Sequence, residues 1–226
     1  MTSPVLMPTE VRIPIGPDHL LGDLVQLPGK AALVLFAHGS GSGRHSARNR
    51  LVASRLHEAG IATLLFDLLT PSEQEDDLHS GRHRFDIALL TRRLEEATQW
   101  ALQALHGPRP VIGFFGASTG SAAALIAAAR LGDRVGAVVS RGGRPDLAGS
   151  AALQALTAPT LLIVGEADRE VVQLNSAAIA HMRCHRSITV IPRAGHLFEE
   201  PGTLQLAADH AAAWFSRHLA WAEEHT

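Results

Sequence analysis

The sequence has little of what several classes of protein require. Cys184 is its only cysteine, which excludes an internal disulfide and agrees with a reducing compartment. No apolar run approaches the roughly 20 residues of a membrane-spanning helix. Residues 1–11 also lack the basic segment and the apolar run of a secretory signal. We therefore expect a soluble, cytoplasmic protein without a membrane partner.

The chain also lacks a clear excess of charge of either sign. The chain has 20 Lys and Arg residues against 22 Asp and Glu residues, a formal net charge of −2, and no strong basic stripe. This balance argues against nucleic acid as a partner. With 46% hydrophobic and 19% charged residues, the 226-residue chain is typical of a globular protein, and we expect one domain over residues 1–226.

Motifs for metals and cofactors are missing as well. His181, Cys184 and His185 lie close together, but they have no zinc-ligand spacing, and there is no H-E-x-x-H. We expect no metal and no cofactor.

What the chain does have is an alternation of apolar strands and helical segments. An opening hairpin is followed by buried runs that each precede a helical period. The alternation predicts an α/β fold with a mainly parallel central sheet and helices on both faces. The expected strands are Val11–Ile15, Leu20–Leu27, Ala31–Ala37, Ile61–Phe66, Val111–Phe115, Val135–Ser140, Thr160–Val164 and Ile188–Ile191. Between them, Leu69–His83 is polar and acidic and is predicted to be a surface loop.

The most specific motif lies between Val111–Phe115 and the helical segment Thr119–Leu131. It reads G-x-S-x-G, from Gly116 through Ser118 to Gly120. Small residues on both sides of the serine allow a tight turn from strand to helix, and such a turn exposes the hydroxyl. Two glycines in an ordinary loop are the alternative, but the flanking strand and helix favour Ser118 as a nucleophile.

A serine hydroxyl needs a base, and the expected chain order is Ser, then Asp or Glu, then His. Asp168 follows the strand Thr160–Val164, and His196 follows the strand Ile188–Ile191. Both therefore belong at the carboxyl edge of the sheet, where we expect Asp168 to orient His196 as the general base. The competing carboxylates in this stretch are Glu166 and Glu170.

The loop after Ala37 is rich in glycine and begins with His38 and Gly39. An oxyanion needs two N–H donors. We expect these from Thr119, directly after the nucleophile, and from Ser40, with His38 and Gly39 beside the substrate. A phosphate-binding loop is the alternative, although neither G-x-x-x-x-G-K-[ST] nor a dinucleotide fingerprint is present.

Through His38-Gly39, the Gly116–Gly120 motif, Asp168 and His196, nearly the whole chain resembles the α/β-hydrolase superfamily. Within it, the chain is similar to small bacterial hydrolases of the dienelactone hydrolase type. The resemblance implies a sheet of about seven or eight strands. Dienelactone hydrolases carry a nucleophilic cysteine, whereas this chain has Ser118, which favours ester or thioester hydrolysis. The segment 141–159, where this superfamily inserts its lids, is too short for a large cap domain, and we expect an open site.

The leading hypothesis is a serine hydrolase that cleaves small carboxylic esters or thioesters through an acyl-enzyme. A non-catalytic ligand-binding protein with this fold and an acyltransferase with the same three residues are the alternatives.

Arg141 is a further candidate. It follows the strand Val135–Ser140 and so belongs near Ser118, where its guanidinium could bind a substrate carboxylate, as the carboxylate-bearing lactones of dienelactone hydrolases suggest. A salt bridge from Arg141 to Asp146 or Glu166 is the structural alternative.

Overall fold

The structure is a computed structural model that describes residues 7–27, 29, 32–105 and 110–220. Its centre is an eight-stranded sheet with the strand order β1-β2-β4-β3-β5-β6-β7-β8. The strands are β1 (Thr9–Ile15), β2 (Asp18–Val25), β3 (Ala32–Ala37), β4 (Ala62–Phe66), β5 (Val111–Ala117), β6 (Val135–Arg141), β7 (Thr160–Gly165) and β8 (Arg186–Ile191). The predicted mainly parallel sheet is confirmed. Ala31, where we expected the third strand to begin, lies outside the described residues.

The sheet consists of an antiparallel hairpin at one edge and parallel strands in the rest. β1 and β2 form the predicted hairpin, and β2 joins the sheet antiparallel to β4. The strands from β4 to β8 in the sheet order are parallel. β3, β4, β5 and β7 are buried along almost their whole length. Helices cover both faces of the sheet, so these strands do not alternate between apolar and polar residues. All parallel strands end at one edge, and the predicted site residues lie there.

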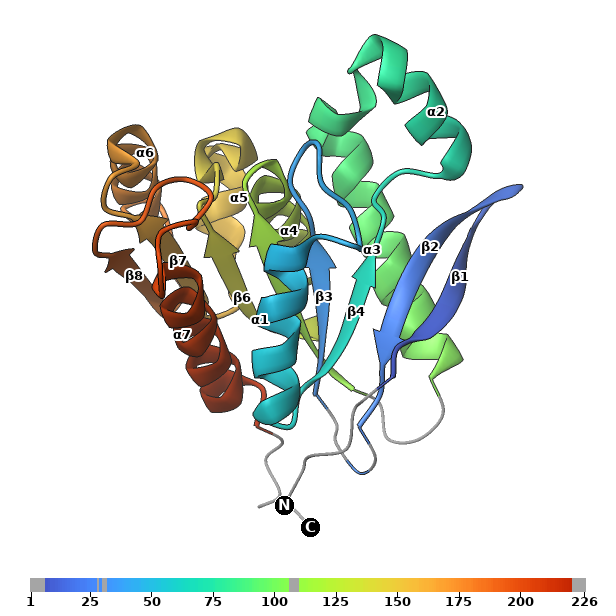
Figure 1. The fold of residues 1–226 in the computed structure, drawn as a ribbon, viewed down its shortest axis with the longest axis horizontal. Coiled ribbons are helices and arrows are strands. Elements are labelled where there is room, and N and C mark those ends of the chain that lie inside the picture. Colours follow the sequence, from blue (N-terminus) through green and yellow to red (C-terminus); the bar gives the residue numbers. More distant parts are fainter. Residues whose placement is uncertain (1–6, 28, 30–31, 106–109, 221–226) are drawn as a thin grey trace.

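Helices cover the sheet in two layers (Figure 1). α1 and α7 pack against each other on one face, and α3, α4, α5 and α6 cover the other. The α-helices are α1 (Ala47–Glu58), α2 (Pro71–Ser80), α3 (Ile87–Ala104), α4 (Thr119–Leu131), α5 (Gly149–Ala155), α6 (Arg169–Ile179) and α7 (Thr203–His218), and the short 3₁₀ turns are η1 (His83–Phe85), η2 (Gly132–Arg134) and η3 (Pro145–Ala148). The segment 141–159 holds only η3 and α5, so there is no large cap there, as predicted.

The prediction of a surface loop over Leu69–His83 is wrong, because this segment contains the helix α2. Thr70 and Glu73 form a capping box: Thr70 Oγ1 accepts the Glu73 N–H at 3.3 Å, and the Thr70 N–H donates to Glu73 Oε2 at 2.9 Å. A proline occupies the first helical position, and Gly81 ends the helix with φ 64°. The T-x-x-E signature of this helix start is present in the sequence, but the loop prediction relied on the many acidic residues of the segment instead.

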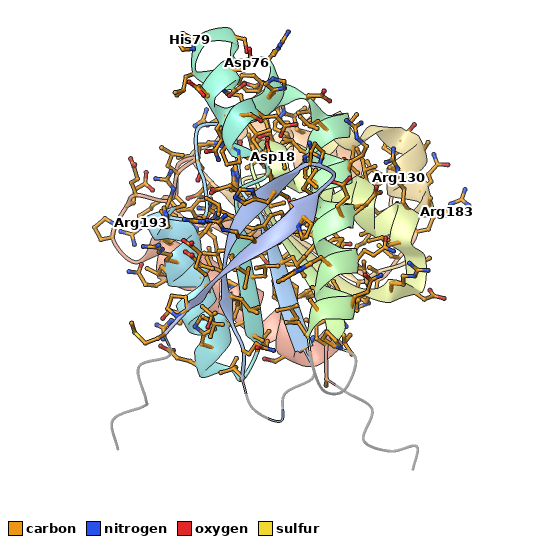
Figure 2. The ribbon with its side chains drawn as sticks, turned by 90° about the vertical axis from the view of Figure 1, so that its right-hand side faces the viewer. Asp18, Asp76, His79, Arg130, Arg183 and Arg193 are labelled. Carbon is orange, nitrogen blue, oxygen red and sulfur yellow. The ribbon has the colours of Figure 1, made fainter. Side chains whose placement is uncertain are left out.

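α2 stands above the carboxyl ends of β3 and β4, apart from the two main helical layers (Figure 1). Figure 2 shows Asp76 and His79 at its outer end. Within the described part of the chain, no helix is both long enough and apolar enough to cross a membrane.

Candidate active site

Ser118 occupies the turn between β5 and α4 in a strained conformation. Its φ is 50°, a value that residues other than glycine rarely adopt. The flanking glycines permit this turn. A Cβ on Gly120 would lie 2.2 Å from the carbonyl oxygen of Ala37, and a Cβ on Gly116 would lie 2.5 Å from Cα of Ser121. The small residues of the motif are therefore required by close backbone contacts, and the turn holds the serine at the edge of the sheet.

The structure brings Ser118, His196 and Asp168 together from three separate loops. Ser118 Oγ lies 3.4 Å from His196 Nε2, and His196 Nδ1 lies 2.6 Å from Asp168 Oδ2. The carboxylate can only accept, so Nδ1 carries the hydrogen and Nε2 is left to accept a proton from the serine. The side chain of His196 is 39% exposed and that of Asp168 is 17% exposed, so the imidazole is open to solvent. This arrangement is able to activate a serine hydroxyl.

Hydrogen bonds brace the loop that carries His196. The Gly195 N–H donates to Glu200 Oε2 at 3.0 Å, and this bond lowers the pKa of Glu200. The Arg193 N–H donates to Glu166 Oε2 at 2.9 Å. Glu166, a competitor for the place beside the histidine, is thus used to hold the loop. The sequence analysis missed Glu200, because an acidic residue five positions further along has no motif of its own.

Ser40 and Thr119, the two predicted oxyanion donors, meet beside Ser118. The Thr119 N–H is at the first position of α4, where a helix provides no acceptor of its own. The Ser40 N–H donates to Thr119 Oγ1 at 2.9 Å. Gly39 allows the close approach, since a Cβ there would lie 3.0 Å from Cβ of Ser118. Ser40 thus lies beside the nucleophile, but its N–H already has an acceptor.

His38 holds this loop in place through both of its ring nitrogens. The Leu68 N–H donates to His38 Nε2 at 3.0 Å, so Nδ1 carries the hydrogen and donates to the Gly39 carbonyl oxygen at 2.9 Å. Burial lowers the pKa of His38, which keeps the ring neutral. His38 thus fixes the position of Gly39 and Ser40.

Arg141 ends β6 directly beside the nucleophile. It is paired in register with Ala117, and its carbonyl oxygen accepts the Ser118 N–H at 3.2 Å. The residue is only 7% exposed, and its Nε and Nη1 atoms have no hydrogen-bond partner. Burial, and to a smaller extent the charge of Arg48, lower its pKa to about 10.

The structural alternative for Arg141 is not observed. Asp146 pairs with Arg144 at 2.7 Å, and Glu166 binds the loop before His196. In the described ranges no carboxylate lies within ion-pair distance of Arg141. The ring of Phe198 lies 5.5 Å from its guanidinium carbon and gives it a cation–π contact.

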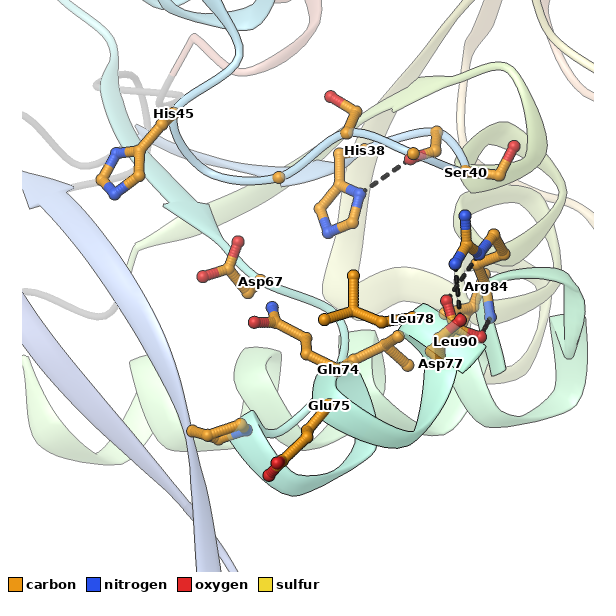
Figure 3. A pocket seen from close by; sticks show the side chains of 16 residues that line it. His38, Ser40, His45, Asp67, Gln74, Glu75, Asp77, Leu78, Arg84 and Leu90 are labelled. Atoms are coloured by element: carbon orange, nitrogen blue, oxygen red, sulfur yellow. Dashed lines mark hydrogen bonds and ion pairs between the residues drawn. The ribbon is translucent and has the colours of Figure 1, made fainter. Parts of the chain in front are cut away.

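Two hollows meet at the loop that contains Gly39, Ser40 and Ser42. The smaller one, about 270 Å³, is here called the basic hollow; its lining includes Ser46, Arg48, Asn49, Ser118, Arg141 and His196. The larger one, about 590 Å³, is called the α2 hollow (Figure 3); its lining includes His38, Leu69, Gln74, Leu78, Arg84 and Leu90. Because the hollows share the loop, a substrate at Ser118 can extend into both. The sequence analysis missed the part of α1 in this site, because only the fold brings it there.

Residues 30–220 match the α/β-hydrolase domain family, and the chain belongs to this family. The crystal structure of dienelactone hydrolase from Anabaena variabilis is 50% identical in sequence, with a TM-score of 0.89 over 94% of this chain and 99% of that chain. An esterase domain from Rhodothermus marinus shares the fold at 18% identity, with a TM-score of 0.73 over 95% of this chain and all of that chain. The predicted dienelactone hydrolase-like fold is therefore confirmed.

Two curated relatives, from two strains of Mycobacterium tuberculosis, carry the name "Putative phosphoribosyl transferase". Each is 50% identical to this chain over 216 residues, which are 96% of this chain and 48% of the relative. The chain thus spans about half the length of the curated relatives it matches.

Proposed function

We propose that this protein is a serine hydrolase that cleaves small carboxylic esters or thioesters through an acyl-enzyme. The observation that supports the proposal best is the chain of contacts from Ser118 Oγ to His196 Nε2, at 3.4 Å, and from His196 Nδ1 to Asp168 Oδ2, at 2.6 Å. A lone serine hydroxyl is a weak nucleophile, and a base held by an acid is what activates it.

The proposed reaction has two halves. Ser118 Oγ attacks the carbonyl carbon while its proton passes to His196 Nε2, and the bond to the leaving oxygen or sulfur breaks as the histidine returns that proton to it. Water then attacks the acyl-enzyme, gives a proton to His196 and releases the acid and the serine hydroxyl. Asp168 stays ionised throughout and stabilises the imidazolium.

The oxyanion of each tetrahedral intermediate is proposed to bind the N–H groups of Thr119 and Ser40. The Ser40 N–H must first exchange the Thr119 hydroxyl, its present acceptor, for the substrate oxygen. Hydrogen bonds of catalytic groups often take their final form only with substrate bound.

The two alternatives from the sequence are an acyltransferase and a non-catalytic protein. An acyltransferase would use the same serine, with another acceptor in place of water. The transferase name of the mycobacterial relatives belongs to chains about twice as long as this one. A non-catalytic role is disfavoured because Ser118 keeps a strained φ of 50°, and such strain persists mainly at functional positions.

The test is hydrolysis of 4-nitrophenyl acetate and butyrate, together with labelling by a fluorophosphonate probe. We expect wild-type protein to hydrolyse both esters and to bind the probe at one site. Ser118→Ala should lose the labelling and about 1,000-fold or more of kcat, because only the N–H donors and binding remain. Ser176→Ala, which changes an exposed serine of α6, is the matched control and should behave as the wild type. Full activity in Ser118→Ala would disprove the assignment.

A further inference from the structure

The basic hollow holds a buried charge that the proposed hydrolysis does not use. Arg141 is 7% exposed, and its Nε and Nη1 atoms have no partner. With a pKa of about 10, its guanidinium is still charged at neutral pH. A buried charge without a counter-charge is among the costliest groups in a protein, so the side chain must serve something other than stability.

Asn49 could accept a hydrogen bond in this hollow, but it cannot compensate the charge of Arg141. Asn49 lines the same hollow, and its buried Oδ1 atom also lacks a hydrogen-bond partner. A neutral amide oxygen can accept one hydrogen bond from a guanidinium, but it does not balance the charge.

The beginning of α1 adds positive potential to the same hollow. Ser46 caps this 12-residue helix, and its side chain already accepts the Asn49 N–H. The N–H groups of Ala47 and Arg48 have no helical acceptor, and the first turn carries no acidic side chain. The start of a helix favours an anion through these groups and the helix dipole.

Arg48 brings a second guanidinium to this place. Its Nη1 lies 3.8 Å from Glu199 Oε1, but the Glu199 side chain is 70% exposed, so the pair is weak. The hollow is therefore lined by two arginines and the start of a helix, and its described lining contains no carboxylate.

We propose that the basic hollow binds a phosphate group of the substrate, between Arg141, Arg48 and the first N–H groups of α1, so that the enzyme prefers esters that carry a phosphate. The inference rests on the proposed function, since it names the substrate class of the same serine. A phosphate dianion matches two guanidinium charges, whereas a carboxylate matches one. The hollow contains Ser118, so the scissile ester would lie within a few bonds of the phosphate.

The test compares esters that differ only in their charged end. One series consists of butyrate esters of propanol, glycolic acid and ethylene glycol phosphate. The other consists of 4-nitrophenyl esters of butyric, succinic and phosphonopropanoic acid. At about pH 8 a phosphate monoester is a dianion, because its second pKa is about 6. We expect kcat/KM to be highest for the phosphate or phosphonate ester in at least one series.

Arg141→Met should then reduce kcat/KM for that ester by about 10- to 100-fold more than for the neutral ester, as expected for loss of a charge-assisted pair. Arg141→Lys should restore part of the preference, because lysine keeps the charge and loses the planar fork. Arg48→Met should reduce the preference less. Arg183→Met is the matched control, since Arg183 projects from the far side of the molecule and should leave the preference unchanged (Figure 2).

Binding to Ser118→Ala separates this inference from the proposed function. Calorimetry on that variant should show the phosphate ester binding at least about 10-fold more tightly than the propyl ester, whatever the nucleophile is. If Arg141→Met does not fold, Arg48→Met carries the test. The proposal is overturned if the carboxylate ester equals or exceeds the phosphate ester in both series, or if the phosphate preference survives Arg141→Met and Arg48→Met.

Discussion

The two hollows on either side of the Gly39–Ser42 loop have opposite characters. In the α2 hollow the one arginine of the lining is paired: Arg84 Nε donates to Asp77 Oδ2 at 2.5 Å, and the N–H groups of His83 and Arg84 donate to Asp77 Oδ1. Leu69, Leu78 and Leu90 give the α2 hollow its apolar part. In the basic hollow, Arg141 is buried, and its Nε and Nη1 atoms have no hydrogen-bond partner. Paired charges hold a wall in place, whereas an unpaired buried charge is free to bind a ligand.

The difference gives a testable picture of the substrate. An ester at Ser118 would place an uncharged group under α2 and a phosphate at the start of α1. The predictions below test whether the hollows differ in this way while they share one serine.

The largest expected effect is common to both hollows. Asp168→Asn should lower kcat by about 1,000- to 10,000-fold for neutral and anionic esters alike, because the histidine then loses the partner that fixes its tautomer. Steady-state kinetics with one ester of each kind measure this. Glu170→Gln, on the exposed side of α6, should have no comparable effect. A loss confined to one kind of ester would mean that the hollows do not serve the same reaction.

A smaller effect should be specific to the α2 hollow. Leu78 is 79% exposed and lines this hollow, so Leu78→Ser should leave stability within about 0.5 kcal/mol of the wild type. It should lower kcat/KM for butyrate relative to acetate by about three- to tenfold, because apolar contact with the ester is lost. Leu206→Ser, at another exposed leucine, on α7, is the control. An unchanged ratio of butyrate to acetate would place the uncharged group elsewhere.

The stability of the ligand-free protein should separate the paired charge from the unpaired one. Arg141→Met should leave the free energy of unfolding unchanged or raise it by about 1 kcal/mol, because methionine removes a buried charge that has no partner. Asp77→Asn should lower the melting temperature by a few degrees, because it weakens the hydrogen bonds to His83 and Arg84. Urea and thermal unfolding measure both. A large loss of stability in Arg141→Met would make this arginine structural.

The smallest effect concerns His38, which lines the α2 hollow. Burial lowers its folded pKa below 6.5, so the unfolded chain binds a proton first as the pH falls. The free energy of unfolding should therefore decrease from about pH 7 downward until the folded pKa is reached, with a slope of at most about 1.4 kcal/mol per pH unit for this group. His38→Gln should flatten the dependence, as urea unfolding between pH 7 and 5 can measure. His57→Gln is a useful comparison, since burial lowers the pKa of His57 too. A steeper dependence in His38→Gln would contradict this account.

Several expectations from the sequence remain predictions. The single domain over residues 1–226, the cytoplasmic location and the absence of nucleic-acid and membrane partners are among them. The ester substrate and the roles of the site residues belong to the proposed function and to its tests.

By itself, the order of residues determined the sheet, the turn at Ser118, and the positions of Asp168 and His196 after β7 and β8. These features depend on local patterns: apolar runs of strand length, glycines at a tight turn, and polar residues at strand ends. α2 had a local signal too, in its capping box, and was missed. Only the tertiary structure decided that Nε and Nη1 of Arg141 have no hydrogen-bond partner, that the Ser40 N–H binds Thr119, and that the start of α1 and Arg141 line one hollow. The physical reason is that burial and the choice of partner depend on segments far apart in the chain, such as α1 and β6. No local sequence pattern shows that two such segments will be neighbours; the fold of the sheet decides it.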